Sequence, residues 1–293
     1  MLGKILKYEF KSMARVYALL YAALLLIALV NGLLLPTDSF NSPLGDSYSS
    51  AVSIGAQTFL SAVFGATILA YTILVVGTAL MPVVISVIRF YKLLGNEGYL
   101  WLTLPVSANT HILGKLISSF VWFIASIIVI VISLGIMLIK TNWIASIPSF
   151  VGSVFSSGLN MWLILFLLCV VCITSYLSSI MHFFTAIAVG PNIVKSRLGG
   201  SVLAYIIGYV IVQSVSAFAG IIGFLLINIT LSGFDETQAL LAVQQSSSLS
   251  ALSEVIDVSV LVTLGGSSLL YVVFSVAFYF ICHHFMSKKL NLA

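Results

Sequence analysis

The sequence has very little charge. Asp, Glu, Lys and Arg make up only 7% of the 293 residues, whereas 61% are apolar and the mean hydropathy is +1.20. Soluble domains carry about 25% charged residues, so this composition excludes a soluble globular protein. It predicts an all-α polytopic membrane protein. The residues outside the apolar stretches are too dispersed for a soluble core, so we expect a single transmembrane domain over residues 1–293.

Groups for catalysis or metal binding are also scarce. Cys169 and Cys172 have the spacing of a redox motif but lie in an apolar stretch, where a thiolate is strongly disfavoured. The 4 histidines offer no metal-binding set. The chain contains no Gly-x-x-x-x-Gly-Lys-Ser/Thr sequence and therefore no phosphate-binding loop of that type. We expect no enzyme activity, no metal and no cofactor on this chain.

Six apolar stretches contain no charged residue. A helix of about 20 apolar residues crosses the ~30 Å of membrane hydrocarbon. The stretches therefore predict six transmembrane helices, over residues 16–35, 59–88, 116–139, 159–187, 201–230 and 260–284. Carriers driven by protons or sodium usually place an acid or a base at membrane depth. The absence of such groups argues against a secondary transporter.

The basic residues gather at a few places along the chain. Eleven of the twelve Lys and Arg residues lie at the N-terminus, in segments 89–115 and 195–197, or at the C-terminal end. Cytoplasmic flanks of membrane helices retain Lys and Arg, so both termini are predicted to be cytoplasmic. This clustering also accounts for the net charge of +4 without a nucleic-acid partner. The external segment 232–259 is predicted to hold one or two short amphipathic helices, with a mobile loop as the alternative.

Residues 1–15 have a helical periodicity of their own. Apolar residues at 2, 5, 6, 10 and 13 fall on one face, opposite Lys4, Lys7, Lys11 and Arg15. The pattern predicts an amphipathic helix in the cytoplasmic interface, with a plain basic tail as the alternative. Glu9 projects from the apolar face, where a carboxylate needs a partner. We expect it to pair with a cytoplasmic base such as Arg89 or Lys92, unless it reaches water.

The segment 89–115, between the second and third spans, is too long for a simple turn and too apolar for a solvated loop. Gly95 and Gly98 permit turns, and Pro105 ends any helix that begins at Tyr99. A short helix with leucine and aromatic anchors suits docking into a groove on a soluble partner. A helix that lies on the membrane, with Tyr99 and Trp101 at headgroup level, is the alternative.

Several motifs carry a resemblance to a known family. They are Lys7-Tyr8-Glu9-Phe10-Lys11, Arg89-Phe90-Tyr91-Lys92, Asn96-Glu97-Gly98-Tyr99-Leu100, Thr103-Leu104-Pro105-Val106-Ser107 and Lys288-Lys289-Leu290-Asn291. With these motifs and six spans, the chain resembles bacterial ABC transporter permeases of the type-2 exporter class, particularly the six-span permeases of Gram-positive bacteria. The resemblance covers nearly the whole chain and implies a multi-pass protein of the bacterial cell membrane. Asn96 departs from the family's pattern, in which Asp is expected, and this puts one charge contact in doubt.

The resemblance implies a site as well. In that family the first cytoplasmic loop supplies a coupling helix, which sits in a cleft of a separate nucleotide-binding subunit that hydrolyses ATP with Mg²⁺. The implied contact residues are Arg89, Tyr91, Lys92, Glu97, Gly98, Tyr99, Leu100, Leu104 and Pro105, with secondary contacts at Glu9, Lys195 and Arg197. The resemblance also implies a second permease chain, identical or homologous, with the export path between the two chains.

Mild polar or small residues within the spans are candidates for a dimer face or for the lining of the path. They are Asn31, Ala204, Gly208 and Gln213. A path lined by apolar and hydroxyl side chains suits an amphipathic or lipophilic cargo, such as a peptide, drug or lipid. We therefore expect the permease subunit of an ABC exporter, in contact with membrane lipid. A scaffold or channel subunit without ATPase coupling is one alternative, and an intramembrane enzyme, which would need positioned nucleophiles or paired acids, is another.

Overall fold

In the computed structural model, the apolar runs fold as helices. The structure describes residues 2–34, 51–94, 108–138, 148–149, 152, 161–194, 196–232 and 259–288. Hydrocarbon offers the peptide groups no hydrogen bonds, so a spanning segment must satisfy its own backbone. Over the described residues the regular structure is helical, without strands, and six helices are long and apolar enough to cross a membrane. The predicted all-α class with six membrane-spanning helices is confirmed.

The element order is simple. The helices are α1 (Leu2–Leu34), α2 (Ala51–Leu94), α4 (Ala108–Met137), α6 (Met161–Val189), α7 (Arg197–Ser232) and α10 (Gly266–Lys288). Between α6 and α7 lies a 3-10 turn, η1 (Gly190–Asn192), and a π-helical turn, η2 (Leu261–Gly265), leads into α10. The predicted external segment 232–259 lies, except at its two ends, outside the described residues.

Several helices extend further than the uncharged stretches that predicted them, α1 and α2 by the most. The first, α1, is continuous from Leu2, so the predicted interfacial helix over residues 1–15 leads directly into the first span. The second, α2, has 44 residues and includes Arg89 and Lys92. At 1.5 Å per residue it is about 66 Å long, about twice the thickness of the hydrocarbon. Its charged end can therefore lie outside the hydrocarbon while the helix continues. The interfacial placement of residues 1–15 and the cytoplasmic location of both termini stay predictions.

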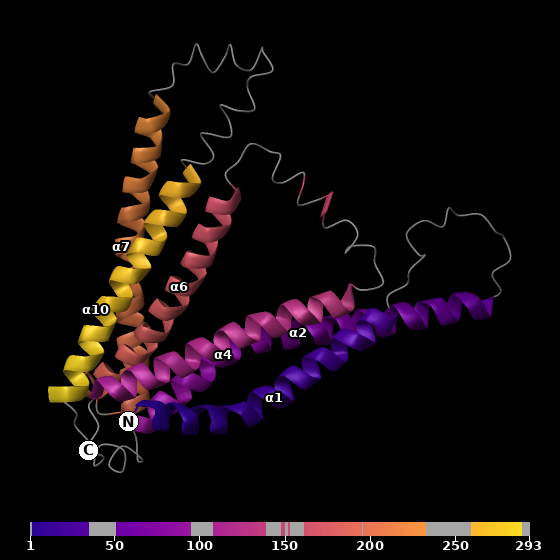
Figure 1. Ribbon diagram of the computed structural model, residues 1–293, viewed down its shortest axis with the longest axis horizontal. Helices are drawn as coiled ribbons and strands as arrows, with labels where there is room; N and C mark the ends of the chain where they lie inside the picture. Colours follow the sequence, from indigo (N-terminus) through magenta and orange to yellow (C-terminus); the bar gives the residue numbers. More distant parts are fainter. Residues whose placement is uncertain are drawn as a thin grey trace. The chain divides into compact units, whose positions relative to one another are not determined.

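The chain divides into two compact units. The first contains residues 1–85 and 117–149, and the second contains residues 86–116 and 150–293. In the first unit, Leu24 and Ala28 of α1 form an apolar core with Tyr71 of α2, against which side chains of α4 pack. In the second unit, α6 contacts both α7 and α10 (Figure 1). There, the Thr185 hydroxyl of α6 donates a hydrogen bond to the Phe278 carbonyl of α10 at 2.8 Å.

A line of serines on α4 joins the three helices of the first unit. Ser119, Ser126 and Ser133 are seven residues apart and buried, so they lie on one face of the helix. Their hydroxyls lie 3.4 Å from the Pro82 carbonyl, 2.8 Å from the Tyr21 hydroxyl and 2.9 Å from the Tyr71 hydroxyl, respectively. Small polar residues let membrane helices approach closely and hydrogen-bond across the contact. The serine line therefore satisfies buried hydroxyls while it holds α1, α2 and α4 together.

A buried amide makes a second link between α1 and α2. Asn31 is 0% exposed, and its Nδ2 donates to the carbonyls of Thr67 at 3.2 Å and Ile27 at 3.1 Å. The Thr67 hydroxyl donates in return to Asn31 Oδ1 at 2.8 Å. Both ends of the amide are thus satisfied. The structure places this predicted path-lining candidate in a helix contact within the chain.

Replacing Asn31 by Leu tests the strength of this link. We expect Asn31→Leu to lower the free energy of unfolding by about 1–2 kcal/mol, because hydrogen bonds between membrane helices are worth roughly that much. Unfolding of the purified chain in mixed micelles, followed as denaturing detergent is added, measures the change. Thr72→Val is the matched control, since the exposed Thr72 hydroxyl bonds only to Ile68 of its own helix. Equal losses in both variants would contradict a special role for Asn31.

Candidate functional site

The helix ends that border the predicted coupling segment belong to the second unit. That unit includes residues 86–116, with the last turns of α2 and the first turns of α4. Because α2 continues to Leu94 and α4 begins at Ala108, the interval between them is shorter than the predicted 89–115. Arg and Lys are good helix formers, which explains why α2 continues past its first cation. Glu97, Gly98, Tyr99, Leu100, Leu104 and Pro105 lie outside the described residues.

The end of α2 is fixed to α6 by an aromatic stack. The rings of Phe90 and Phe184 lie 4.1 Å apart, with planes inclined by 9°, and both residues are 0% exposed. Leu93, one turn further along, is also buried, whereas Lys92 is exposed and Arg89 and Tyr91 are half-buried. One face of this helix end therefore packs into the unit, and another presents a cation.

Several residues at the start of α4 are buried, although Asn109 and Leu113 are exposed. His111, Ile112 and Lys115 are buried. Lys115, which the sequence places in a cytoplasmic segment, is 7% exposed, and its cytoplasmic location stays a prediction. Glu9, on α1, is also buried, at 8% exposed. Burial of a carboxylate agrees with the expectation that Glu9 has a partner, and pairing with Arg89 or Lys92 stays a prediction.

A tight turn joins α6 to α7. The backbones of Gly190 and Gly200 lie in contact there. A Cβ on Gly190 would collide with the Ser201 backbone, and a Cβ on Gly200 would collide with the Gly190 backbone. Ile193 and Val194 are exposed beside the half-buried Arg197. Lys195 lies outside the described residues. The sequence did not predict these two exposed apolar residues, because the charges of Lys195 and Arg197 are the stronger signal in this turn.

One histidine is enclosed by aromatic rings in the second unit. The His182 ring of α6 stacks on Tyr205 of α7 at 4.5 Å and on Phe278 of α10 at 4.8 Å between ring centroids. A backbone group of Tyr205 faces the ring, but buried Nε2 has no partner within hydrogen-bond geometry among the described residues. Nε2 lies against Gly208, where a Cβ would collide with it. Gly208 therefore serves a contact between α6 and α7 of the same chain.

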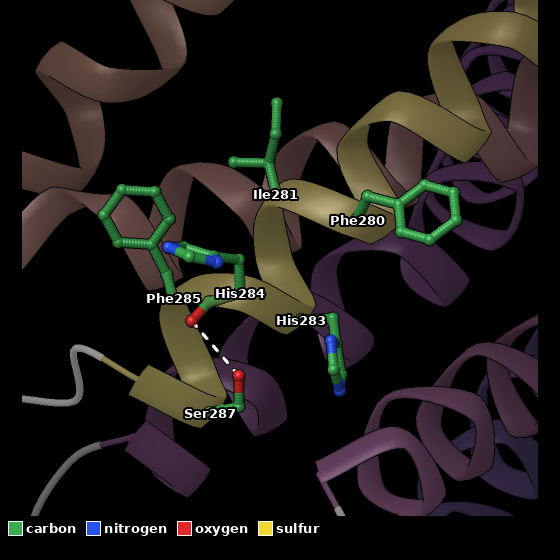
Figure 2. A pocket seen from close by; sticks show the side chains of 6 residues that line it. All are labelled: Phe280, Ile281, His283, His284, Phe285 and Ser287. Atoms are coloured by element: carbon green, nitrogen blue, oxygen red, sulfur yellow. Dashed lines mark hydrogen bonds between the residues drawn. The ribbon is translucent and has the colours of Figure 1, made fainter.

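Two hollows lie on the second unit. One, of about 530 Å³, is lined by Phe280, Ile281, His283, His284, Phe285 and Ser287 at the end of α10. Its two imidazoles point to different sides, so they do not converge on one ligand (Figure 2). The other, of about 460 Å³, lies between α7 and the η2–α10 region. We call it the α7–α10 groove, and its walls are apolar side chains, glycines and the hydroxyls of Ser216, Thr263, Ser267 and Tyr271.

The described residues include no cluster of three or more His, Cys, Asp or Glu side chains that could hold a metal ion. Cys169 and Cys172 are exposed on α6, and Cys282 is buried in α10. Of the remaining predicted candidates, Ala204 is half-buried and Gln213 is exposed. Among the predicted site residues, the structure groups Arg89, Tyr91 and Lys92 at the end of α2 in one unit with α6 and the α6–α7 turn.

The comparisons with known proteins add no relative. No family model matches the chain, and no curated protein or solved structure matches it.

Replacing Phe90 by Ala tests the stack that holds the end of α2. We expect Phe90→Ala to lower the free energy of unfolding by about 3 kcal/mol, because it empties a fully buried ring site. Ile88→Ala is the matched control, since Ile88 is 49% exposed on the same helix. Thermal unfolding in detergent, followed by circular dichroism, compares the two. If Phe90→Ala costs no more than Ile88→Ala, the stack does not hold the end of α2.

A double variant tests the glycine at the enclosed histidine. Gly208→Ala adds a methyl group where His182 Nε2 lies, and we expect it to destabilise the chain by about 1–3 kcal/mol. In a His182→Ala background the same change should cost much less, because the space is then empty. The two costs come from thermal unfolding of four proteins, including the wild type. Equal costs in both backgrounds would place the effect of Gly208 elsewhere.

Proposed function

We propose that the chain is the transmembrane permease subunit of an ABC exporter, driven by ATP hydrolysis on a separate nucleotide-binding subunit. The observation that carries the proposal is the way the borders of the segment 95–107 are held. Both borders lie in one unit with α6, α7 and α10, and Phe90 is stacked on Phe184. A partner that grips the segment between them thus has a stiff attachment to the transmembrane helices.

The sequence supports the assignment of transport to this chain and of ATP hydrolysis to a partner subunit. The six apolar stretches carry no charge, so coupling to an ion gradient lacks its usual groups. The chain also lacks a phosphate-binding loop of the common type, while its motifs resemble type-2 exporter permeases. Energy then comes from a partner, and the apolar loop residues, with Glu97 and Tyr99, supply the contact. The exposed Ile193 and Val194 of the α6–α7 turn form a second, smaller contact beside Arg197.

The mechanism is mechanical. Closure of the nucleotide-binding subunits around ATP moves the coupling segment, and the Phe90–Phe184 stack passes that movement to α6. The turn between α6 and α7 then carries it to α7, because its two glycines pack backbone against backbone. Coupling requires that the segment be held differently in the two nucleotide states, since a partner can only shift an equilibrium between states that it binds differently.

The cargo is an amphipathic or lipophilic molecule, such as a peptide, drug or lipid, that moves outward through the bacterial cell membrane. The α7–α10 groove supports this class, because it combines apolar walls with hydroxyls and has no charged lining residue. A second permease chain completes the path. Sites of this composition are typical for largely apolar ligands with a few polar groups.

A variant of the coupling segment tests the proposal. Glu97→Ala together with Tyr99→Ala should leave the chain folded in the membrane but abolish stimulation of the partner's ATPase and export, because the contact is lost. A nucleotide-binding subunit should co-purify with the wild type from its native membrane. The amount that co-purifies with the double variant should be at least tenfold lower. Asn109→Ala, exposed at the start of α4, is the control and should behave as the wild type. Purification of the wild type without any nucleotide-binding protein would refute the proposal.

A further inference from the structure

Gln213 lies exposed in the middle of α7. The candidate span on this helix runs from Arg197 to Ile229, so Gln213 is at its midpoint. The structure gives its carboxamide no hydrogen bond with any described residue. Asn228 differs, since its Nδ2 donates to the Phe224 carbonyl of the same helix at 2.8 Å. A free carboxamide at this depth cannot be satisfied by lipid tails, so it needs another protein group.

The exposed stripe that contains Gln213 is a continuous helix face. It consists of Ile206, Tyr209, Gln213, Ala217, Gly220 and Phe224, three or four residues apart, and we call it the Gln213 face. The residues that turn inward follow a different line, and Gly208 on that line contacts His182 of α6. Ala217 and Gly220 are small, and nothing lies within 4 Å of a Cβ built on Gly220. The backbone of another helix can therefore approach closely beside Gln213.

A second copy of the chain fits this face best. A carboxamide both donates and accepts hydrogen bonds, so it complements another carboxamide. A two-fold axis brings a surface against its own copy, which places Gln213 opposite Gln213. The polar side chains of the first unit are less suitable, because the pairs Asn31–Thr67, Tyr21–Ser126 and Tyr71–Ser133 already bond to each other.

We infer that α7 pairs with α7 of a second copy through the Gln213 face, and that the two Gln213 carboxamides hydrogen-bond across the two-fold axis. This interface deepens the proposed function and rests on it, because it specifies which surface joins the two permease chains. The face shares Gly220 and Phe224 with the lining of the α7–α10 groove, so the second chain would also border that groove.

Self-association of the full chain in lipid vesicles tests the interface. Donor- and acceptor-labelled chains are mixed in phosphatidylcholine vesicles, and energy transfer is followed as lipid dilutes the protein. Gln213→Leu should weaken association by about 3- to 30-fold, which corresponds to the worth of a hydrogen bond between membrane helices. Asn228→Leu is the matched control and should leave association unchanged, because its amide is satisfied within its own helix. Association that is absent in the wild type, or unchanged in Gln213→Leu, would overturn the inference.

Disulfide formation identifies the face directly. In a chain whose three native cysteines are replaced by Ala, Ala217→Cys should form a dimer of two chains on mild oxidation. Ile211→Cys, exposed at similar depth on another side of α7, should not. A dimer formed equally well at both positions, or none at Ala217→Cys, would count against the Gln213 face. Neither assay contains a nucleotide-binding subunit, so failure here is distinct from failure of the proposed function, which the ATPase co-purification decides.

Discussion

Membrane hydrocarbon satisfies no polar group, and much of the structure follows from that constraint. It requires helices wherever the chain crosses, because only a helix satisfies the backbone of a single segment. It also requires partners for polar side chains. In the first unit Asn31 and Thr67 satisfy each other, and the serines of α4 meet a hydroxyl of α1, a hydroxyl of α2 and a carbonyl of α2. Where the described residues supply no partner, as at Gln213, the same constraint favours the proposed second chain.

The second unit contains both the end of α2, where the partner is proposed to act, and the helices α6 and α7, which are proposed to move. Phe90 stacks on Phe184 at the end of α2, and Gly190 packs against Gly200 and Ser201 in the turn between α6 and α7. Aromatic and backbone contacts of this kind are closely packed, and packed interiors transmit displacement rather than absorb it. In the proposed mechanism, a pull on the segment after Leu94 would pass through these contacts to α6 and α7. Between α7 and α10, glycines and hydroxyls leave a groove in place of tight packing.

The sequence predicted the number and type of the spanning helices because hydrophobic length is a strong signal. It was less informative at helix ends. Arg89 and Lys92 mark a change of surroundings but favour helix as well as leucine does, so α2 continues past them. At its other end α2 begins at Ala51, before the predicted start of the second span at residue 59. The Phe90–Phe184 stack, the enclosure of His182 and the grouping of residues 86–116 with α6 depend on contacts between distant residues. No local pattern encodes such contacts. The interfacial helix and the coupling helix stay predictions from the sequence.

Photo-crosslinking from position 99 tests the central claim most directly. A photoreactive phenylalanine analogue replaces Tyr99 in the full chain, and the membranes of the native host are irradiated with and without a slowly hydrolysed ATP analogue. The account predicts a covalent adduct with a nucleotide-binding subunit whose yield changes with the nucleotide. Adducts with phospholipid alone, in membranes that still transport, would contradict it.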